Sequence, residues 1–163
     1  MVATANPRRA SAMALAFRDY NSIDSTMLKA KKLLGEISST ESLIKSEFKI
    51  TGIINMWGSL RDTSLITKNQ AIQMPMIIFH GTKDLQMTFN SKFKNEMISY
   101  GAYSVAHCYK NSGACCRLNT KTGAIHGEGF SLEDRANEIS CFFKTVFCKT
   151  CIYSEKENTE KRQ

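Results

Sequence analysis

The chain lacks the features that mark several large classes of protein. None of its 163 residues fall in a run of roughly 18 consecutive apolar residues, the length that a membrane-spanning helix needs. Residues Met1–Arg9 contain no apolar core of a signal peptide, and no internal repeat is present. The composition, 42% hydrophobic and 23% charged, is instead typical of one globular domain with one core.

The formal charge of +7 is not concentrated in one segment of the sequence. Lysines and arginines are scattered along the chain, and no stripe of basic residues alternates with aromatic ones. A nucleic-acid-binding surface usually shows such a concentration. We therefore predict a solvated basic surface and no nucleic-acid partner.

Cysteine is abundant for a chain of this length. The six cysteines are Cys108, Cys115, Cys116, Cys141, Cys148 and Cys151. An even number favours disulfides in an exported protein, although the N-terminal residues show no export signal. Cys115 or Cys116 with Cys141, and Cys148 with Cys151, are the pairings that we consider. Reduced, partly buried thiols are an alternative, and zinc bound by Cys115, Cys116, Cys148 and Cys151 is another.

The pattern of apolar residues predicts strands between helices. Phe48–Trp57 is a β-branched, mostly apolar run that ends at glycine, as in a buried strand. Met74–His80 is apolar without alternation and also ends at glycine, as in a parallel strand covered on both faces. Val105–Tyr109 is predicted as a further short strand. The expected fold class is therefore α/β, a partial and mainly parallel sheet of about three strands flanked by helices.

Helices and loops are predicted around these strands. Helices are expected at Ala10–Phe17, at Ser25–Ile37, at Ser91–Tyr100 with Phe93, Met97 and Ile98 inward, and after Ser131, where Leu132, Ala136, Ile139, Phe143 and Val146 recur at helical spacing. Ser131 is the predicted N-cap of the last helix, with Asp134 three residues later. Segments 38–46 and 111–123 are predicted loops. We divide the chain into an irregular N-terminus (1–9), a domain (10–153) and a charged disordered tail (154–163).

Two polar residues are placed where chemistry usually occurs in such a sheet. Asp84 follows the predicted strand that ends at His80 and the turn-permitting Gly81, beyond the carboxyl end of that strand. His126 stands in a glycine-rich loop before the last helix. A carboxylate that accepts the Nδ1 proton of an imidazole leaves Nε2 free to act as a base. His80 and His107 are predicted to be structural. Trp57 and the phenylalanines of the last helix are predicted to lie in the core.

These segments resemble the α/β-hydrolase superfamily, in its esterase and lipase branch. Pro75–Asp84 (PMIIFHGTKD) resembles the strand and acid turn of that family, which commonly reads H-G-x-x-D after an apolar strand. His126–Phe130 (HGEGF) is similar to its histidine loop, and Gly52–Leu60 to the strand before the acid strand. The acid precedes the histidine, as in the family. The resemblance covers Phe48 to Val146.

The resemblance implies an activity and a site. It implies hydrolysis of carboxylic esters or related acyl substrates through a serine acyl-enzyme, with no cofactor or metal. Asp84 and His126 would be the acid and the base of the triad. The substrate would be a small ester or acyl compound bound by the full-length parent protein.

The sequence departs from the family at the nucleophile. The G-x-S-x-G elbow does not occur, and the position expected for the serine lies near or before Asn6. Ser11 is the nearest hydroxyl, but Arg9 and Met13 occupy the glycine positions around it, and we predict no strand before it. The oxyanion-hole loop is also missing, and Met87-Thr88 replace the usual V-P after the acid turn.

We therefore expect a truncated or degenerate hydrolase that is inactive by itself. The alternative is a non-catalytic binding module that reuses the half-sheet. An exposed apolar strand edge at Phe48–Trp57 would favour that alternative, because such an edge invites pairing with another chain.

Overall fold

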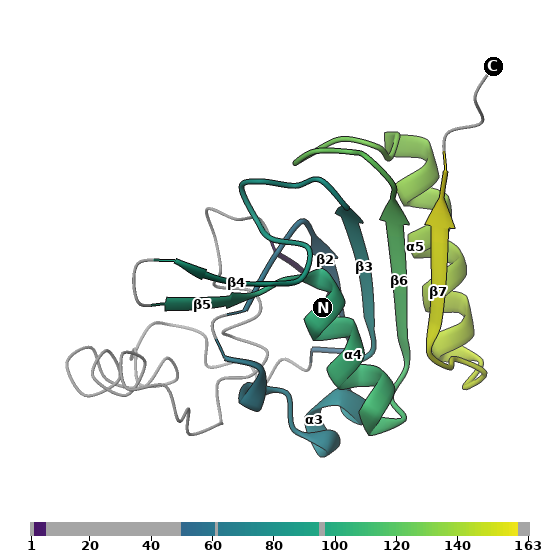
Figure 1. The fold of residues 1–163 in the computed structure, drawn as a ribbon. Helices are drawn as coiled ribbons and strands as arrows, with labels where there is room; N and C mark the ends of the chain where they lie inside the picture. Colours follow the sequence, from purple (N-terminus) through teal and green to yellow (C-terminus); the bar gives the residue numbers. More distant parts are fainter. Residues whose placement is uncertain (1, 6–49, 61, 95–96, 160–163) are drawn as a thin grey trace, which may run out of the picture.

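Five parallel strands form the centre of the protein in the computed structural model, which describes residues 2–5, 50–60, 62–94 and 97–159. The strands are β1 (Val2–Ala5), β2 (Gly52–Met56), β3 (Met76–Gly81), β6 (Cys116–Lys121) and β7 (Ser154–Asn158). Their order across the sheet is β1-β2-β3-β6-β7, and every neighbouring pair is parallel. The predicted α/β class with a mainly parallel sheet is confirmed (Figure 1). The helices predicted at 10–17 and 25–37, the loop at 38–46, and Ser11 lie outside the described residues.

The two clearest predicted strands are present. β2 lies within its predicted run, and β3 overlaps its run and extends one residue further, to Gly81. All six residues of β3 are buried, as expected for a central parallel strand. β2 is not an edge, because β1 pairs with it on one side and β3 on the other. The exposed edge that we considered at Phe48–Trp57 is therefore wrong, and so is the irregular N-terminus at residues 2–5.

The core has two halves, one on each face of the sheet. On one face, Ile53, Met76, Ile78 and Leu118 pack with α4 (Ala102–Ser112) and with α3 (Lys68–Gln73). On the other, Ile54, Ile77 and Phe79 pack with α5 (Leu132–Phe147) through Phe142 and Phe143. Side chains of successive strand residues point to opposite faces, so each continuous apolar strand supplies both halves.

The segment Ser91–Tyr100 is a hairpin and not the predicted helix. β4 (Ser91–Lys94) pairs antiparallel with β5 (Met97–Tyr100), with Phe93 opposite Ile98. Phe93 is 70% exposed and Ile98 41% exposed, so the prediction that they point inward is also wrong. The alternation of Lys92, Phe93 and Lys94 has the period of two that a strand requires, and it competes with the helical spacing.

The predicted short strand at Val105–Tyr109 lies inside helix α4. The buried residues of this helix are Ala102, Val105, Ala106 and Tyr109. Their i, i+3, i+4, i+7 spacing is that of an amphipathic helix. The prediction failed because it began at Val105 and missed the first buried residue, Ala102.

Two segments predicted to lack regular structure are strands. The predicted loop 111–123 contains β6, in which Cys116, Leu118 and Asn119 are buried. The predicted disordered tail 154–163 contains β7, which pairs with β6 along its whole length. β7 is an edge strand within the described residues, and charged side chains are common on edge strands because they prevent pairing with other chains. Polar composition alone therefore misled both predictions.

The last helix, α5, begins where it was predicted. The Ser131 hydroxyl accepts a hydrogen bond from the Asp134 amide at 3.0 Å, which satisfies one free donor of the first turn. Leu132, the first residue of the helical spacing, is 77% exposed. The predicted core position is confirmed for Phe142 and Phe143, and it is wrong for Phe147, which is 72% exposed near the end of the helix.

One disulfide joins Cys115 to Cys151, before the starts of β6 and β7. The pairings considered for Cys141 and for Cys148 with Cys151 are wrong, because Cys108, Cys116, Cys141 and Cys148 are free thiols. Within the described residues, no three His, Cys, Asp or Glu side chains are grouped to hold a metal ion. None of the described helices has the length and apolar character needed to cross a membrane.

Candidate active site

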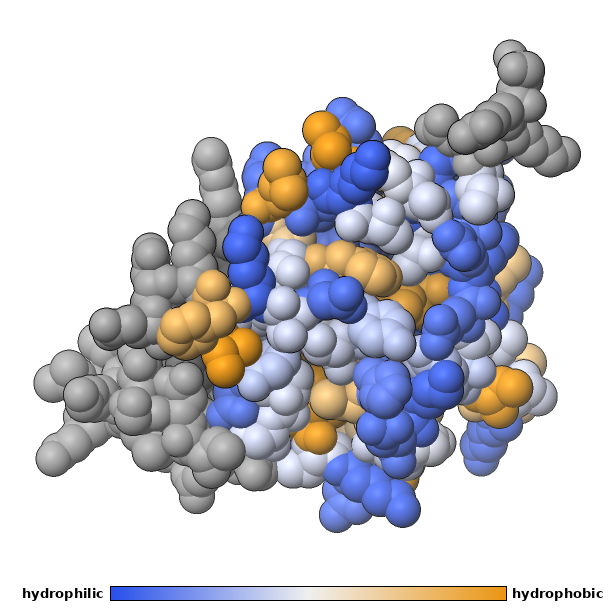
Figure 2. Space-filling view, viewed as in Figure 1, coloured by the Kyte–Doolittle hydropathy of each residue, from blue (hydrophilic) through white to orange (hydrophobic). Residues whose placement is uncertain are grey.

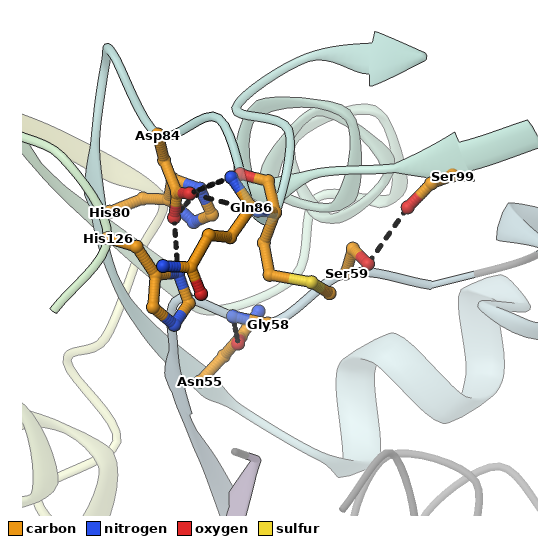
Figure 3. A network of polar contacts seen from close by, with 9 residues as sticks. Asn55, Gly58, Ser59, His80, Asp84, Gln86, Ser99 and His126 are labelled. Atoms are coloured by element: carbon orange, nitrogen blue, oxygen red, sulfur yellow. Dashed lines mark hydrogen bonds and ion pairs between the residues drawn. The ribbon is translucent and has the colours of Figure 1, made fainter. Parts of the chain in front are cut away.

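Asp84 and His126 meet beyond the carboxyl ends of two neighbouring strands. Asp84 lies in the turn after β3, and His126 in the loop after β6. The distance from His126 Nδ1 to Asp84 Oδ2 is 2.7 Å (Figure 3). The two residues singled out in the sequence are thus in direct contact, although they are 42 positions apart.

Backbone hydrogen bonds hold the two loops side by side. The Thr82 amide donates to the Lys121 carbonyl at 3.1 Å, and the Lys83 amide donates to the Ala124 carbonyl at 3.0 Å. The Gly123 amide donates to the Thr82 hydroxyl at 2.9 Å. Gly81 is required at this junction, because a Cβ atom there would clash with the backbone of Ala124. The loop that carries Asp84 and the loop that carries His126 are therefore held together by hydrogen bonds.

Asp84 is a buried and fully bonded carboxylate. Its side chain is 0% exposed. Oδ1 accepts hydrogen bonds from the amides of Gln86 and Met87, both at 2.9 Å, which form a tight turn after the acid. Oδ2 is left to face His126. Because burying a charge is costly unless it is bonded, this set of donors is what allows a carboxylate to lie here.

The contact determines which nitrogen of His126 carries the proton. An ionised carboxylate can only accept hydrogen bonds, so Nδ1 is the donor and Nε2 of the neutral ring carries the lone pair. The side chain of His126 is 16% exposed. Gly127 and Gly129 follow it in the chain with φ of +81° and +88°, which few residues other than glycine adopt.

Trp57 packs beside His126 from the end of β2. The centroids of the two rings are 6.2 Å apart. Trp57 has a φ of +52°, an uncommon value for a bulky residue. Two hydrogen bonds hold this conformation: the Trp57 amide donates to the Phe79 carbonyl at 3.0 Å, and the Gly58 amide donates to Asn55 Oδ1 at 2.9 Å. Trp57 is buried as predicted, and its place next to His126 could not be inferred from its sequence position.

His80 contacts the acid from the other side. Its Nε2 lies 3.0 Å from the Met87 carbonyl oxygen and 3.3 Å from Asp84 Oδ2. Burial is the main cause that lowers the pKa of His80 below 6.5, against the opposing effects of the bond to Met87 and the charge of Asp84. The sequence offered one signal for this contact, namely the position of His80 four residues before the acid. His107, by contrast, is exposed on α4 and far along the chain from the acid turn.

Among the described residues, no hydroxyl or thiol group is hydrogen-bonded to His126 Nε2. β1 runs parallel to β2, so its carboxyl end lies at the same edge of the sheet as Asp84 and His126. The statement that no strand precedes Ser11 is therefore wrong. The residue that follows β1 in the chain is Asn6, and a carboxamide is not a nucleophile of the serine type.

Comparisons with protein-family models, with curated proteins and with solved structures found no match for this chain.

Proposed function

We propose that Asp84 and His126 are the acid–base pair of an ester-hydrolysing site of the α/β-hydrolase kind. The observation that carries the proposal is the 2.7 Å contact between His126 Nδ1 and a buried carboxylate, at the edge of a parallel sheet where catalysis usually occurs. A histidine oriented in this way is suited to general acid–base chemistry.

The roles follow from the proton positions. Asp84 fixes the tautomer of His126 and stabilises its imidazolium form. Nε2 takes the proton from the attacking O–H group while the oxygen bonds to the ester carbonyl carbon. When the carbon–oxygen bond to the alcohol breaks, Nε2 returns that proton to the leaving oxygen. The products are a carboxylic acid and an alcohol.

In the proposed reaction of this chain, a water molecule supplies the attacking O–H group. A serine in a G-x-S-x-G elbow would supply it in the family that the sequence resembles. Here Asn6 follows β1, and the 163 residues contain no such elbow. We propose that the chain by itself forms no acyl-enzyme and hydrolyses activated esters slowly, through general-base attack by water.

Apolar groups of the ester are the parts that this site is suited to contact. Leu85 and Ile125, the chain neighbours of Asp84 and His126, are 86% and 49% exposed. Hydrophobic residues are visible at the surface above this edge of the sheet (Figure 2). Apolar side chains that flank the acid–base pair favour esters with apolar substituents.

The test uses the histidines as matched controls. We expect slow hydrolysis of p-nitrophenyl butyrate that is lost in His126→Asn and unchanged in His107→Asn, because His107 lies exposed on α4. A fluorophosphonate probe should label neither protein at serine. Equal rates in the two variants would contradict the role of His126, and serine labelling would contradict the absence of a nucleophile.

A gain of function tests the placement of β1. Thr4→Gly, Asn6→Ser and Arg8→Gly together create G-A-S-P-G at residues 4–8, with its serine directly after the last residue of β1. We expect this variant to react with fluorophosphonate at the new serine, and to lose that reactivity when His126→Asn is added. Labelling that does not depend on His126 would show that this histidine does not act as the base for a serine placed after β1.

A further inference from the structure

We infer that His80 is a positioning residue of this site, which holds the acid turn and directs the carboxylate of Asp84 toward His126. The inference rests on the proposed function, because it assigns a role in the geometry of the Asp84–His126 pair. His80 itself is fully buried, so it does not contact a substrate.

The donor on His80 is identified by its partners. Nε2 lies 3.0 Å from the carbonyl oxygen of Met87, and a carbonyl can only accept a hydrogen bond. Nε2 therefore carries the proton. The same N–H lies 3.3 Å from Asp84 Oδ2, so it is shared between the turn and the acid.

Two hydrogen bonds of Met87 hold the turn after β3, one to Asp84 and one from His80. The amide of Met87 donates to Asp84 Oδ1 at 2.9 Å, while the carbonyl of Met87 accepts from His80. Oδ1 is occupied by the amides of Gln86 and Met87, and Oδ2 lies between the imidazoles of His80 and His126. The carboxylate thus has one orientation that satisfies all its neighbours, and in it Oδ2 faces His126.

The cost of burying His80 supports a role beyond packing. Its Nδ1 is buried and has no hydrogen-bond partner among the described residues. An apolar side chain at the end of β3 would bury no such atom and would avoid this cost. Phe89 packs against the ring at a centroid distance of 5.8 Å, so the imidazole is also fixed in its plane.

The experiment compares His80→Gln with His80→Met. These side chains have similar length and volume, but only the glutamine amide places an N–H near the position of Nε2. We would measure hydrogen exchange of the Gln86 and Met87 amides, with Ile77 in β3 as the reference, and the proton on His126 Nδ1, by NMR.

In His80→Met we expect the two turn amides to exchange about tenfold faster, the loss expected for one hydrogen bond, with Ile77 unchanged. The His126 Nδ1 proton should also be lost by exchange broadening, and His80→Gln should retain both signals. A general rise in exchange that includes Ile77, or no change at the turn, would overturn the inference. Absence of the His126 Nδ1 proton in the unaltered protein would instead overturn the proposed function, and the inference with it.

Discussion

The two ends of the parallel strands, here called the carboxyl edge and the amino edge of the sheet, differ in the residues that cover them. The carboxyl edge buries polar groups: Asn55, His80 and Asp84 are nearly or fully inaccessible to solvent there. The amino edge is closed by the Cys115–Cys151 disulfide and by apolar residues. Buried polar groups cost free energy unless each is bonded, whereas a disulfide and apolar contacts stabilise the fold directly. The comparison separates an end of the sheet that is cross-linked by a disulfide from an end that buries polar side chains.

A surface hollow lies at the amino edge of the sheet and not beside Asp84 and His126. This hollow, of about 670 Å³, is lined by Thr51, Pro75, Val146, Phe147 and the disulfide. Asp84 and His126 do not line it. This hollow is therefore separate from the hydrogen-bonded Asp84–His126 pair on which the proposed function rests.

The largest effect that we predict concerns the amino edge. Cys115→Ala with Cys151→Ala removes a cross-link between residues 36 positions apart, and should lower the free energy of unfolding by about 4 kcal/mol. Urea denaturation measures this loss, and Cys141→Ala, which removes an exposed free thiol, is the control. The rate of ester hydrolysis should not change. A loss of rate at temperatures where the variant is folded would contradict the separation of the two edges.

A smaller effect is predicted at the junction of the two site loops. Gly81→Ala places a Cβ against the backbone of Ala124 and Ile125, so we expect a loss of roughly 1–3 kcal/mol and separation of His126 from Asp84. Gly123→Ala is the matched control, since a Cβ there meets nothing within 4 Å and only its φ of +79° is unfavourable. Thermal melts and the His126 Nδ1 proton measure the two consequences. Equal behaviour of the two variants would contradict the account of the junction.

The smallest effect is a dependence of stability on pH. Burial lowers the folded-state pKa of His80 from 6.5, so the unfolded chain binds the proton more readily. The His80 contribution to the free energy of unfolding is therefore complete above about pH 6.5 and decreases as the pH falls toward the folded-state pKa. The charges that face His80 are Asp84, which opposes this effect, and His126, which adds to it when protonated.

Urea midpoints of the unaltered protein and of His80→Gln, at about pH 7.5 and about pH 5.5, isolate this contribution. Groups that do not contact His80 titrate alike in both proteins, so their contributions cancel in the comparison. The unaltered protein should lose more stability on acidification than the variant. A larger loss in the variant would mean that His80 is protonated more readily in the folded state.

The structure brings together the two residues that the sequence singled out, whereas several elements between them differ from their predictions. Asp84 and His126 stand in short motifs next to glycines, where local geometry is strongly constrained, and the structure brings both to one edge of the sheet. The strands β6 and β7 escaped prediction because their residues are polar, and their structure depends on pairing with distant strands. A short segment of sequence does not show with which distant strand it will pair.

The supporting contacts of the site were also beyond sequence reasoning. Trp57 lies beside His126 because a hydrogen bond from Gly58 to Asn55 holds a turn with positive φ. His80 was classed as structural, and its second partner, the carbonyl of Met87, depends on the path of the turn. Both contacts depend on the path of the folded chain and cannot be inferred from the types of the residues involved.

The most direct test of the acid–base pair is a long-range proton–nitrogen NMR spectrum of the three histidines. In the unaltered protein we predict that His126 carries its proton on Nδ1, with a low-field signal that persists in water because the bond to Asp84 is short and partly buried. In Asp84→Asn this signal should disappear while the ring signals of His107, which lies exposed on α4, stay unchanged. A His126 ring that carries its proton on Nε2, or a low-field signal unaffected by Asp84→Asn, would contradict the account.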